Sequence, residues 1–270
     1  MILLATLLAA GLATASPATP PPPTDDALVL QLTDKTTRDA ARHELASRGA
    51  EAVPTLVKHV HDADEQLRWE IANLLGAAAD ERGAPALADL ALHETNSHIR
   101  WRALWALSRT TTNDKAIAAM RKGMQEQNAE TQWAAALGLS FFGSAEGIDL
   151  IHANVANPDP FRRWEAINAL GRVHNEKTVS VLKPALRSPS LRDRNEVVLS
   201  LGMIGGAEAR ALLVDSLSDD KADVRWRAAM ALGRAGDASN IASLRLLASG
   251  DPDSMVREQA AKAADKLAKR

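Results

Sequence analysis

The sequence predicts an all-α protein, an α-solenoid of about eight stacked helical hairpins. Three observations support this prediction. The 270-residue chain is rich in alanine and leucine, lacks cysteine and tyrosine, and contains 3% aromatic residues, a composition that favours helices over strands. Its apolar residues recur at helical spacing. One short segment also repeats along the chain at a nearly constant interval, which is typical of stacked repeats.

The N-terminal residues are predicted to lie outside this solenoid. An apolar run ends in Ala-Thr-Ala at 13–15, the small-residue pattern that signal peptidase cleaves, and it is too short to span a bilayer. We therefore expect 1–15 to be a signal peptide, and the mature protein to be periplasmic or secreted without stable membrane insertion. The alternative is an apolar N-terminal helix of a cytosolic protein. The proline-rich residues 16–24 should form an extended linker, so that the solenoid spans 25–270.

The repeated segment is an amphipathic helix that usually carries a tryptophan. In VRWRAAMALGRAGD, which starts at Val224, small and branched residues gather on one face. Trp226 lies about 200° from Val224 at about 100° per residue, near the middle of the opposite face. Seven further segments share this register. The second residues of the eight copies are 39, 69, 101, 133, 164, 195, 226 and 258.

Between the copies runs a second apolar-periodic segment, such as APALADLALH from Ala84, so each unit is predicted to be a helical hairpin. A hairpin of this size cannot bury its own apolar face, and the copies must share a continuous core. The atypical first and last copies are expected to be caps. Glycines are expected to end the tryptophan-bearing helices, at Gly76, Gly143, Gly171, Gly205-Gly206 and Gly236.

The pattern V-R-x-x-A-A-x-A-L-G-x-x-G-D resembles the short HEAT repeats named after phycobilisome-linker lyases, over nearly all of residues 25–270. The resemblance implies that the second helix of each hairpin lines the concave side. It also implies an acidic residue six positions before a structural arginine, the two forming a ladder between units. The matching pairs are Asp62 with Arg68, Glu94 with Arg100, Asp219 with Arg225 and Asp251 with Arg257, whereas Asn157, Ser188 and Gln132 depart from the pattern.

The resemblance gives no support for an enzyme. Deoxyhypusine hydroxylase, a HEAT-repeat enzyme, would by this resemblance hold two irons with His-Glu pairs at the start of the same helix. The corresponding pairs here are Trp69-Glu70, Trp164-Glu165 and Asn195-Glu196, and an indole has no lone pair to offer a metal. Bilin lyases, which share the repeat, leave no diagnostic residue here. We therefore expect no catalytic residue, no metal and no cofactor.

Charge and motif content exclude other classes. The formal net charge is −2, whereas a nucleic-acid-binding surface normally gives a basic excess. The glycines follow helix ends at the repeat interval, which is a turn signal and not a phosphate-binding loop. The seven histidines share no register. Nothing in the sequence indicates the oligomeric state.

The tryptophans are the candidate binding residues. Five of the six occupy one position of the repeat and should form a row along the concave groove, interrupted at Asn195 and widened by Trp105. The alternative is that the indoles pack against neighbouring units and stiffen the stack. With their charged neighbours, the expected partner-binding residues are Trp69, Glu70, Trp101, Arg102, Trp105, Trp133, Trp164, Glu165, Asn195, Glu196, Trp226 and Arg227.

The sequence thus predicts a non-catalytic binding or scaffold protein of the cell envelope. An extended or helical segment of another protein is the expected partner, because concave solenoid surfaces are long and the neighbours of the indoles are chiefly Arg and Glu. A glycan is the alternative ligand, since indole faces stack on sugar rings. An enzyme of the lyase or hydroxylase type is the remaining alternative.

Overall fold

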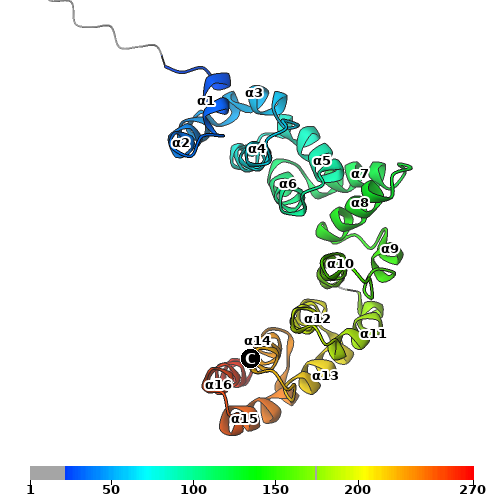
Figure 1. The fold of residues 1–270 in the computed structure, drawn as a ribbon. Coiled ribbons are helices and arrows are strands. Elements are labelled where there is room, and N and C mark those ends of the chain that lie inside the picture. The colour runs from blue at the N-terminus through cyan, green and yellow to red at the C-terminus, as the bar shows by residue number, and fades with distance from the viewer. Residues whose placement is uncertain (1–21, 174) are drawn as a thin grey trace, which may run out of the picture.

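The computed structural model describes residues 22–173 and 175–270, which form an all-α solenoid (Figure 1). In this part of the chain sixteen α-helices pack as consecutive pairs, and no strand occurs. The predicted fold class and the eight hairpins are therefore confirmed. The predicted signal peptide at 1–15 and most of the linker at 16–24 lie outside the described residues, so those predictions are not tested.

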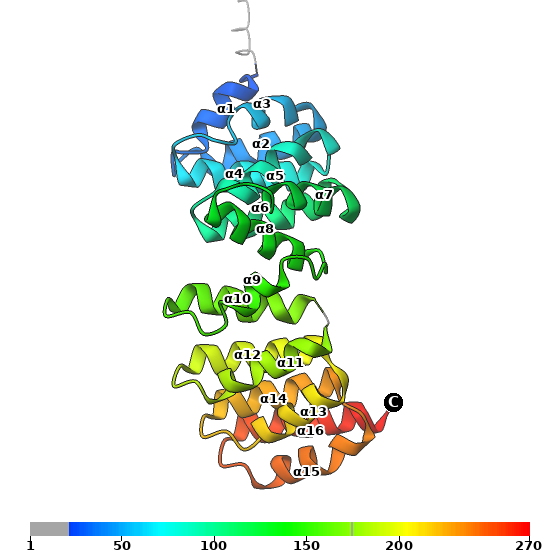
Figure 2. The same ribbon diagram turned by 90° about the vertical axis from the view of Figure 1, so that its right-hand side faces the viewer.

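The helices form two rows along an arc. Figure 1 shows the even-numbered helices on the inner side of the arc and the odd-numbered helices on the outer side. Figure 2 shows the helices stacked one above another along the length of the molecule, with most of their axes running across it. The inner row consists of α2 (Arg38–Arg48), α4 (Glu65–Ala78), α6 (Ser97–Thr110), α8 (Ala129–Phe141), α10 (Pro160–Arg172), α12 (Leu191–Ile204), α14 (Ala222–Ala235) and α16 (Ser254–Ala268). The outer row consists of α1 (Asp25–Gln31), α3 (Val53–Lys58), α5 (Ala84–His93), α7 (Asn113–Gly123), α9 (Ile148–His152), α11 (Val179–Leu182), α13 (Gly206–Ser216) and α15 (Ile241–Gly250).

Each inner helix contains one copy of the repeated segment, and most begin at a polar N-cap. The Asp64 side chain, for example, accepts a hydrogen bond of 2.8 Å from the backbone N–H of Leu67. Such a cap satisfies one of the free N–H groups of the first turn and stabilises a helix by about 1 kcal/mol. The same role falls to Asn96, Asn128, Asp159, Ser190 and Asp253.

Two of the predicted helix-ending glycines have another role. Gly143 and Gly205 have φ of +77° and +70° and follow their helices, as predicted. Gly76 and Gly171, in contrast, lie inside α4 and α10, so the prediction of a turn there is wrong. A Cβ at Gly76 would lie 2.8 Å from the Cβ of Ala106 on α6. The glycine is needed because successive inner helices approach closely at this point, and the same approach recurs at Gly171, Gly202 and Gly233.

The apolar core consists of two clusters that meet at α8. One cluster extends from α1 to α8 and the other from α8 to α16. Helix α8 contributes Ala135 and Leu139 to the first cluster, and Trp133 and Leu137 to the second. This one helix therefore joins the two halves of the solenoid.

The arginine of the repeat links successive units. Arg68 donates a hydrogen bond of 2.8 Å to the main-chain carbonyl of Asp62, six residues earlier, and two bonds of 2.6 and 3.2 Å to the Glu94 carboxylate of the next unit. Arg225 binds the Asp219 carbonyl and the Asp251 carboxylate in the same way. Each acidic residue of the ladder thus makes two contacts. Its main-chain carbonyl accepts from the arginine six residues later, and its carboxylate accepts from the arginine of the preceding unit.

This ladder is interrupted at α8. Gln132, which replaces the arginine, still donates to the Glu126 carbonyl at 2.7 Å. Arg100 of α6, however, does not reach Glu126 and donates instead to Glu165 of α10 at 2.6 Å. Two inner helices that are two units apart are thereby bonded directly. In Figure 1, α8 accordingly lies nearer the outer row than its neighbours in the inner row do.

The ladder should make stability depend on acidic pH. The hydrogen bond from Arg225 holds the pKa of Asp251 below its usual range. The pair therefore stabilises the fold fully above the unfolded-state pKa of about 3.9, and this contribution is lost as the pH falls through the lower folded-state pKa. We expect Asp251→Asn to cost about 1.5–3 kcal/mol at pH 7 and progressively less below pH ~4.

Urea denaturation followed by circular dichroism at several pH values would measure this difference. Asp265→Asn is the matched control, because Asp265 forms an exposed ion pair with Arg245, and such pairs contribute little. A cost of Asp251→Asn that is independent of pH would contradict the assigned ion pair.

Candidate binding site

The tryptophans differ widely in exposure. Trp105 is 42% exposed, whereas Trp133 is 1% exposed and lies in the core. The four others are partly buried. The predicted row of groove-lining indoles is therefore wrong at Trp133. The physical reason is the set-back position of α8, which carries its indole into the second core cluster instead of onto the concave surface.

The three glutamates predicted to flank the groove are buried acceptors. Glu165 receives hydrogen bonds from Arg100 at 2.6 Å and from the indole N–H of Trp133 at 3.1 Å. Glu196 accepts from Trp164 at 2.8 Å, and Glu70 accepts two bonds of 2.9 Å from Arg42. A buried carboxylate needs such partners to offset its lost hydration. Their predicted role as charges beside the ligand is wrong, because these carboxylates face other side chains of the protein.

A pocket of about 600 Å³ opens where α4, α6, α8 and α10 converge. We call it the central pocket. It brings together four of the predicted binding tryptophans, one predicted arginine and several residues that were not predicted. Its lining consists of Trp69, His98, Trp101, Arg102, Trp105, Phe141, Trp164, Asn168 and Arg172.

Aromatic rings hold two guanidinium groups in place at the central pocket. The Arg102 guanidinium lies 5.4 Å from the ring centroid of Trp69 and 5.0 Å from that of Trp105. The Arg172 guanidinium lies 5.4 Å from Trp101 and 5.1 Å from Phe141. Cation–π contacts of this kind fix the guanidinium plane, while its N–H edges remain able to donate to a carboxylate. No lining residue is acidic.

The polar groups of the central pocket are sparsely satisfied. Arg172 donates from Nε to Asn168 at 3.2 Å, and burial lowers the pKa of its guanidinium. The indole N–H of Trp101 is buried and has no acceptor among the described residues. In the same part of the chain Arg102 forms no ion pair. The pocket thus presents donors and apolar ring faces to whatever enters it.

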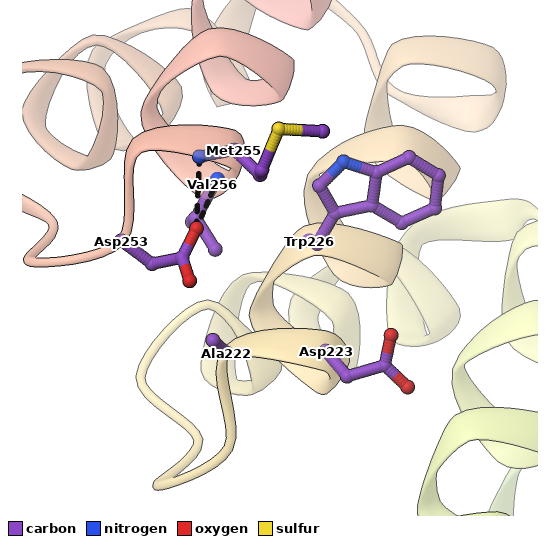
Figure 3. Close-up of a pocket in the computed structure, with 6 residues that line it drawn as sticks. All are labelled: Ala222, Asp223, Trp226, Asp253, Met255 and Val256. Atoms are coloured by element: carbon purple, nitrogen blue, oxygen red, sulfur yellow. Dashed lines mark hydrogen bonds between the residues drawn. The ribbon is translucent and has the colours of Figure 1, made fainter.

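Two smaller pockets occupy positions that are equivalent to each other, each between two successive inner helices. One, of about 460 Å³, lies between α14 and α16 and has Trp226 in its lining; we call it the Trp226 notch. It is lined by Ala222, Asp223, Trp226, Asp253, Met255 and Val256 (Figure 3). The other, of about 420 Å³, lies between α4 and α6 and is lined by the same six repeat positions, Glu65, Gln66, Trp69, Asn96, His98 and Ile99.

The remaining predicted residues lie beside the Trp226 notch. Asn195 donates a hydrogen bond to the Asp223 carboxylate, which also lies 3.4 Å from Nε of Arg227. Asn195, which has no indole to continue the row, therefore binds the next inner helix. Arg227 neutralises part of the charge at Asp223 and does not itself line the notch.

Neither a metal cluster nor a spanning helix is found among the described residues. In residues 22–173 and 175–270 no three His, Cys, Asp or Glu side chains are grouped so that they could hold a metal ion. Within the same residues no helix combines the length and the hydropathy needed to cross a bilayer. The buried glutamates Glu70, Glu165 and Glu196 accept hydrogen bonds from Arg42, Arg100, Trp133 and Trp164.

The stacked helical pairs, the arginine ladder and the aromatic concave side together define an α-solenoid repeat protein. The chain belongs to the HEAT-repeat family, whose model matches residues 26–108, 150–225 and 211–269. These matches leave out 109–149, the part that contains the irregular helix α8. No curated protein is significantly similar to the chain in sequence.

Several solved structures share this fold at low sequence identity. The Escherichia coli protein YibA is 19% identical, with a TM-score of 0.54 over 92% of this chain and 93% of its own. Human deoxyhypusine hydroxylase in complex with glycerol is 23% identical, with a TM-score of 0.42 over 91% and 96%. The CpcE–CpcF complex of phycocyanin lyase from Nostoc sp. is 18% identical, with a TM-score of 0.44 over 94% and 91%. At these identities the likeness extends to the fold alone.

Proposed function

We propose that the protein is a non-catalytic binding or scaffold protein that holds a segment of another protein on its concave side. The observation that carries this proposal is the central pocket, in which aromatic faces and two stacked guanidinium groups meet without an acidic residue. Such a lining suits an apolar segment that carries a carboxylate. Its envelope location remains part of the proposal and rests on the signal-like residues 1–15.

The composition of the pocket favours a protein ligand. Tryptophan and arginine dominate the residues that contribute most to protein–protein affinity, especially where they cluster and exclude water. Trp105 is exposed and flanked by Arg102 and Arg109, both 5.0 Å from its ring centroid. These rigid side chains lose little conformational entropy when a partner binds, because their contacts with one another already hold them.

Crosslinking from the pocket tests the proposal. A photo-crosslinking residue replacing His98, which is exposed at the rim of the central pocket, should capture a protein partner in the native cell. Adding Arg102→Ala and Trp105→Ala should weaken capture by at least about 30-fold, the loss expected for hot-spot residues worth ~2 kcal/mol or more. The fold should persist, because Trp105 is exposed and Arg102 partly exposed, and the two substitutions together should cost about 1–2 kcal/mol, a small part of a typical stability.

A crosslinker at Leu246 on the outer helix α15 provides the matched control, since this residue is also exposed but lies away from the pocket. The same proteins captured equally from both positions would contradict the proposal. So would unchanged capture by the folded Arg102→Ala/Trp105→Ala variant. Release of the bound partner by an acidic glycan, without competition by acidic peptides, would favour the glycan alternative instead.

A further inference from the structure

Trp226 differs from every other tryptophan in what lies over its ring. Five of the six indoles have an arginine guanidinium within 5.4 Å of a ring centroid. Arg102 lies over Trp69 and Trp105, Arg162 over Trp133, Arg172 over Trp101 and Arg192 over Trp164. In residues 22–173 and 175–270, Trp226 alone has no such cation.

Trp164 shows one repeat position from which such a cation can come. Arg192 is the second residue of α12 and lies 4.8 Å from the ring centroid of Trp164 in the preceding inner helix. The corresponding second residue of α16 is Met255, which is 62% exposed and lines the Trp226 notch. Arg227 cannot supply the charge, because it is the next residue along α14 and its guanidinium is directed to Asp223.

The Trp226 notch also carries negative charge. Asp223 and Asp253 both line it, and no basic residue does. Asp253 uses one carboxylate oxygen, Oδ1, to accept from the backbone N–H groups of Met255 and Val256 at 2.8 and 3.2 Å. Its other oxygen has no hydrogen bond within the described chain. Figure 3 shows the two carboxylates on different sides of the notch, with Trp226 and Met255 completing its wall.

We propose that the Trp226 notch binds a basic side chain, lysine or arginine, of a partner segment. The incoming cation stacks on the indole face as Arg192 does on Trp164, passes the Met255 thioether and pairs with the two carboxylates. The proposed function enters this proposal in one respect: it makes a partner protein the molecule that supplies the basic side chain. The segment held on the concave side then carries an acidic residue at the central pocket and a basic residue nearer the C-terminal units.

Small peptides test this site without the natural partner. In ¹⁵N-labelled protein, the indole N–H signal of Trp226, assigned with Trp226→Phe, should shift saturably with acetyl-Ala-Arg-Ala-amide. The same peptide with citrulline, which has the shape of arginine but no charge, should bind about five- to tenfold more weakly, because it loses the cation–π and carboxylate attraction. An equal shift with both peptides, or no shift with either, would overturn the proposal.

Met255→Arg offers an independent test. The new guanidinium should cover Trp226 from within the chain, as Arg192 covers Trp164, and abolish the peptide-induced shift in a protein that remains folded. Leu246→Arg, on an exposed site of α15, adds the same charge elsewhere and should leave the shift intact. Full binding by Met255→Arg would refute the assigned site. These outcomes do not depend on capture at the central pocket, so either proposal can fail alone.

Discussion

Replacing Trp133 with alanine should lower the free energy of unfolding by about 3–5 kcal/mol, the range for truncating a large buried aromatic side chain. The indole is 1% exposed, packs in the second core cluster and donates a hydrogen bond to Glu165. The substitution would leave a cavity at the helix that joins the two clusters. Urea denaturation followed by circular dichroism would measure the loss.

Trp105→Ala is the matched control, because Trp105 occupies an inner helix but is 42% exposed, and should cost about 0.5–1 kcal/mol. Trp133→Phe would keep most of the packing and remove only the N–H donor. A similar, small cost for Trp133→Ala and Trp105→Ala would show that Trp133 is not a core residue. Trp133 substitutions are also unsuitable for testing partner binding, because the loss of a core side chain would lower stability whatever its role in binding.

Removing the carboxylate of Glu165 should be equally damaging. Arg100 is 8% exposed and its one carboxylate partner in the described chain is Glu165. In Glu165→Leu the guanidinium would stay buried without a counter-charge, a situation that typically costs about 3–5 kcal/mol. The Trp133 N–H would lose its acceptor at the same time. Chemical denaturation of Glu165→Leu would measure the loss of the counter-charge and the loss of the indole acceptor together.

The double variant Arg100→Leu/Glu165→Leu separates charge from packing. It should recover part of the loss, because replacing both members of a buried ion pair by apolar residues is far less costly than replacing one. The exposed pair Arg245–Asp265 provides the comparison, and Asp265→Leu should cost less than about 1 kcal/mol. If Glu165→Leu cost no more than this, the bond between α6 and α10 would have no structural importance.

The fold could be predicted because each repeat carries its own local signals. A register near 31 residues, an apolar face and polar N-caps such as Asp64 recur in nearly every unit, and stacking follows from them. The position of α8 could not be predicted with the same rules. Three departures mark it nevertheless: Gln132 in place of the arginine, and Ser108 and Ser140 at the position where α4, α10, α12 and α14 have the glycine of close approach. Read together, they indicate two joints where inner helices do not pack in the usual way.

The binding site could be predicted only in part. A helical wheel places Trp69, Trp101 and Arg102 on the polar face, and the central pocket contains all three. It does not reveal that Arg172 reaches Trp101 from a helix two units away. The burial of Glu165 also depends on Arg100 crossing the same distance. Contacts between units that are not adjacent have no periodic signal in the sequence, and these contacts shape the pocket.

The direct bond between α6 and α10 has a mechanical consequence. A solenoid behaves as an elastic arc, because each unit contacts mainly its neighbours and small rotations add along the stack. Opening the arc would stretch the Arg100–Glu165 bond, because in the described chain it is the one side-chain hydrogen bond found between inner helices that are two units apart. The central pocket lies between the same helices. The width of the central pocket therefore depends on the curvature of the arc. A partner segment that fills the pocket would hold the arc at one curvature.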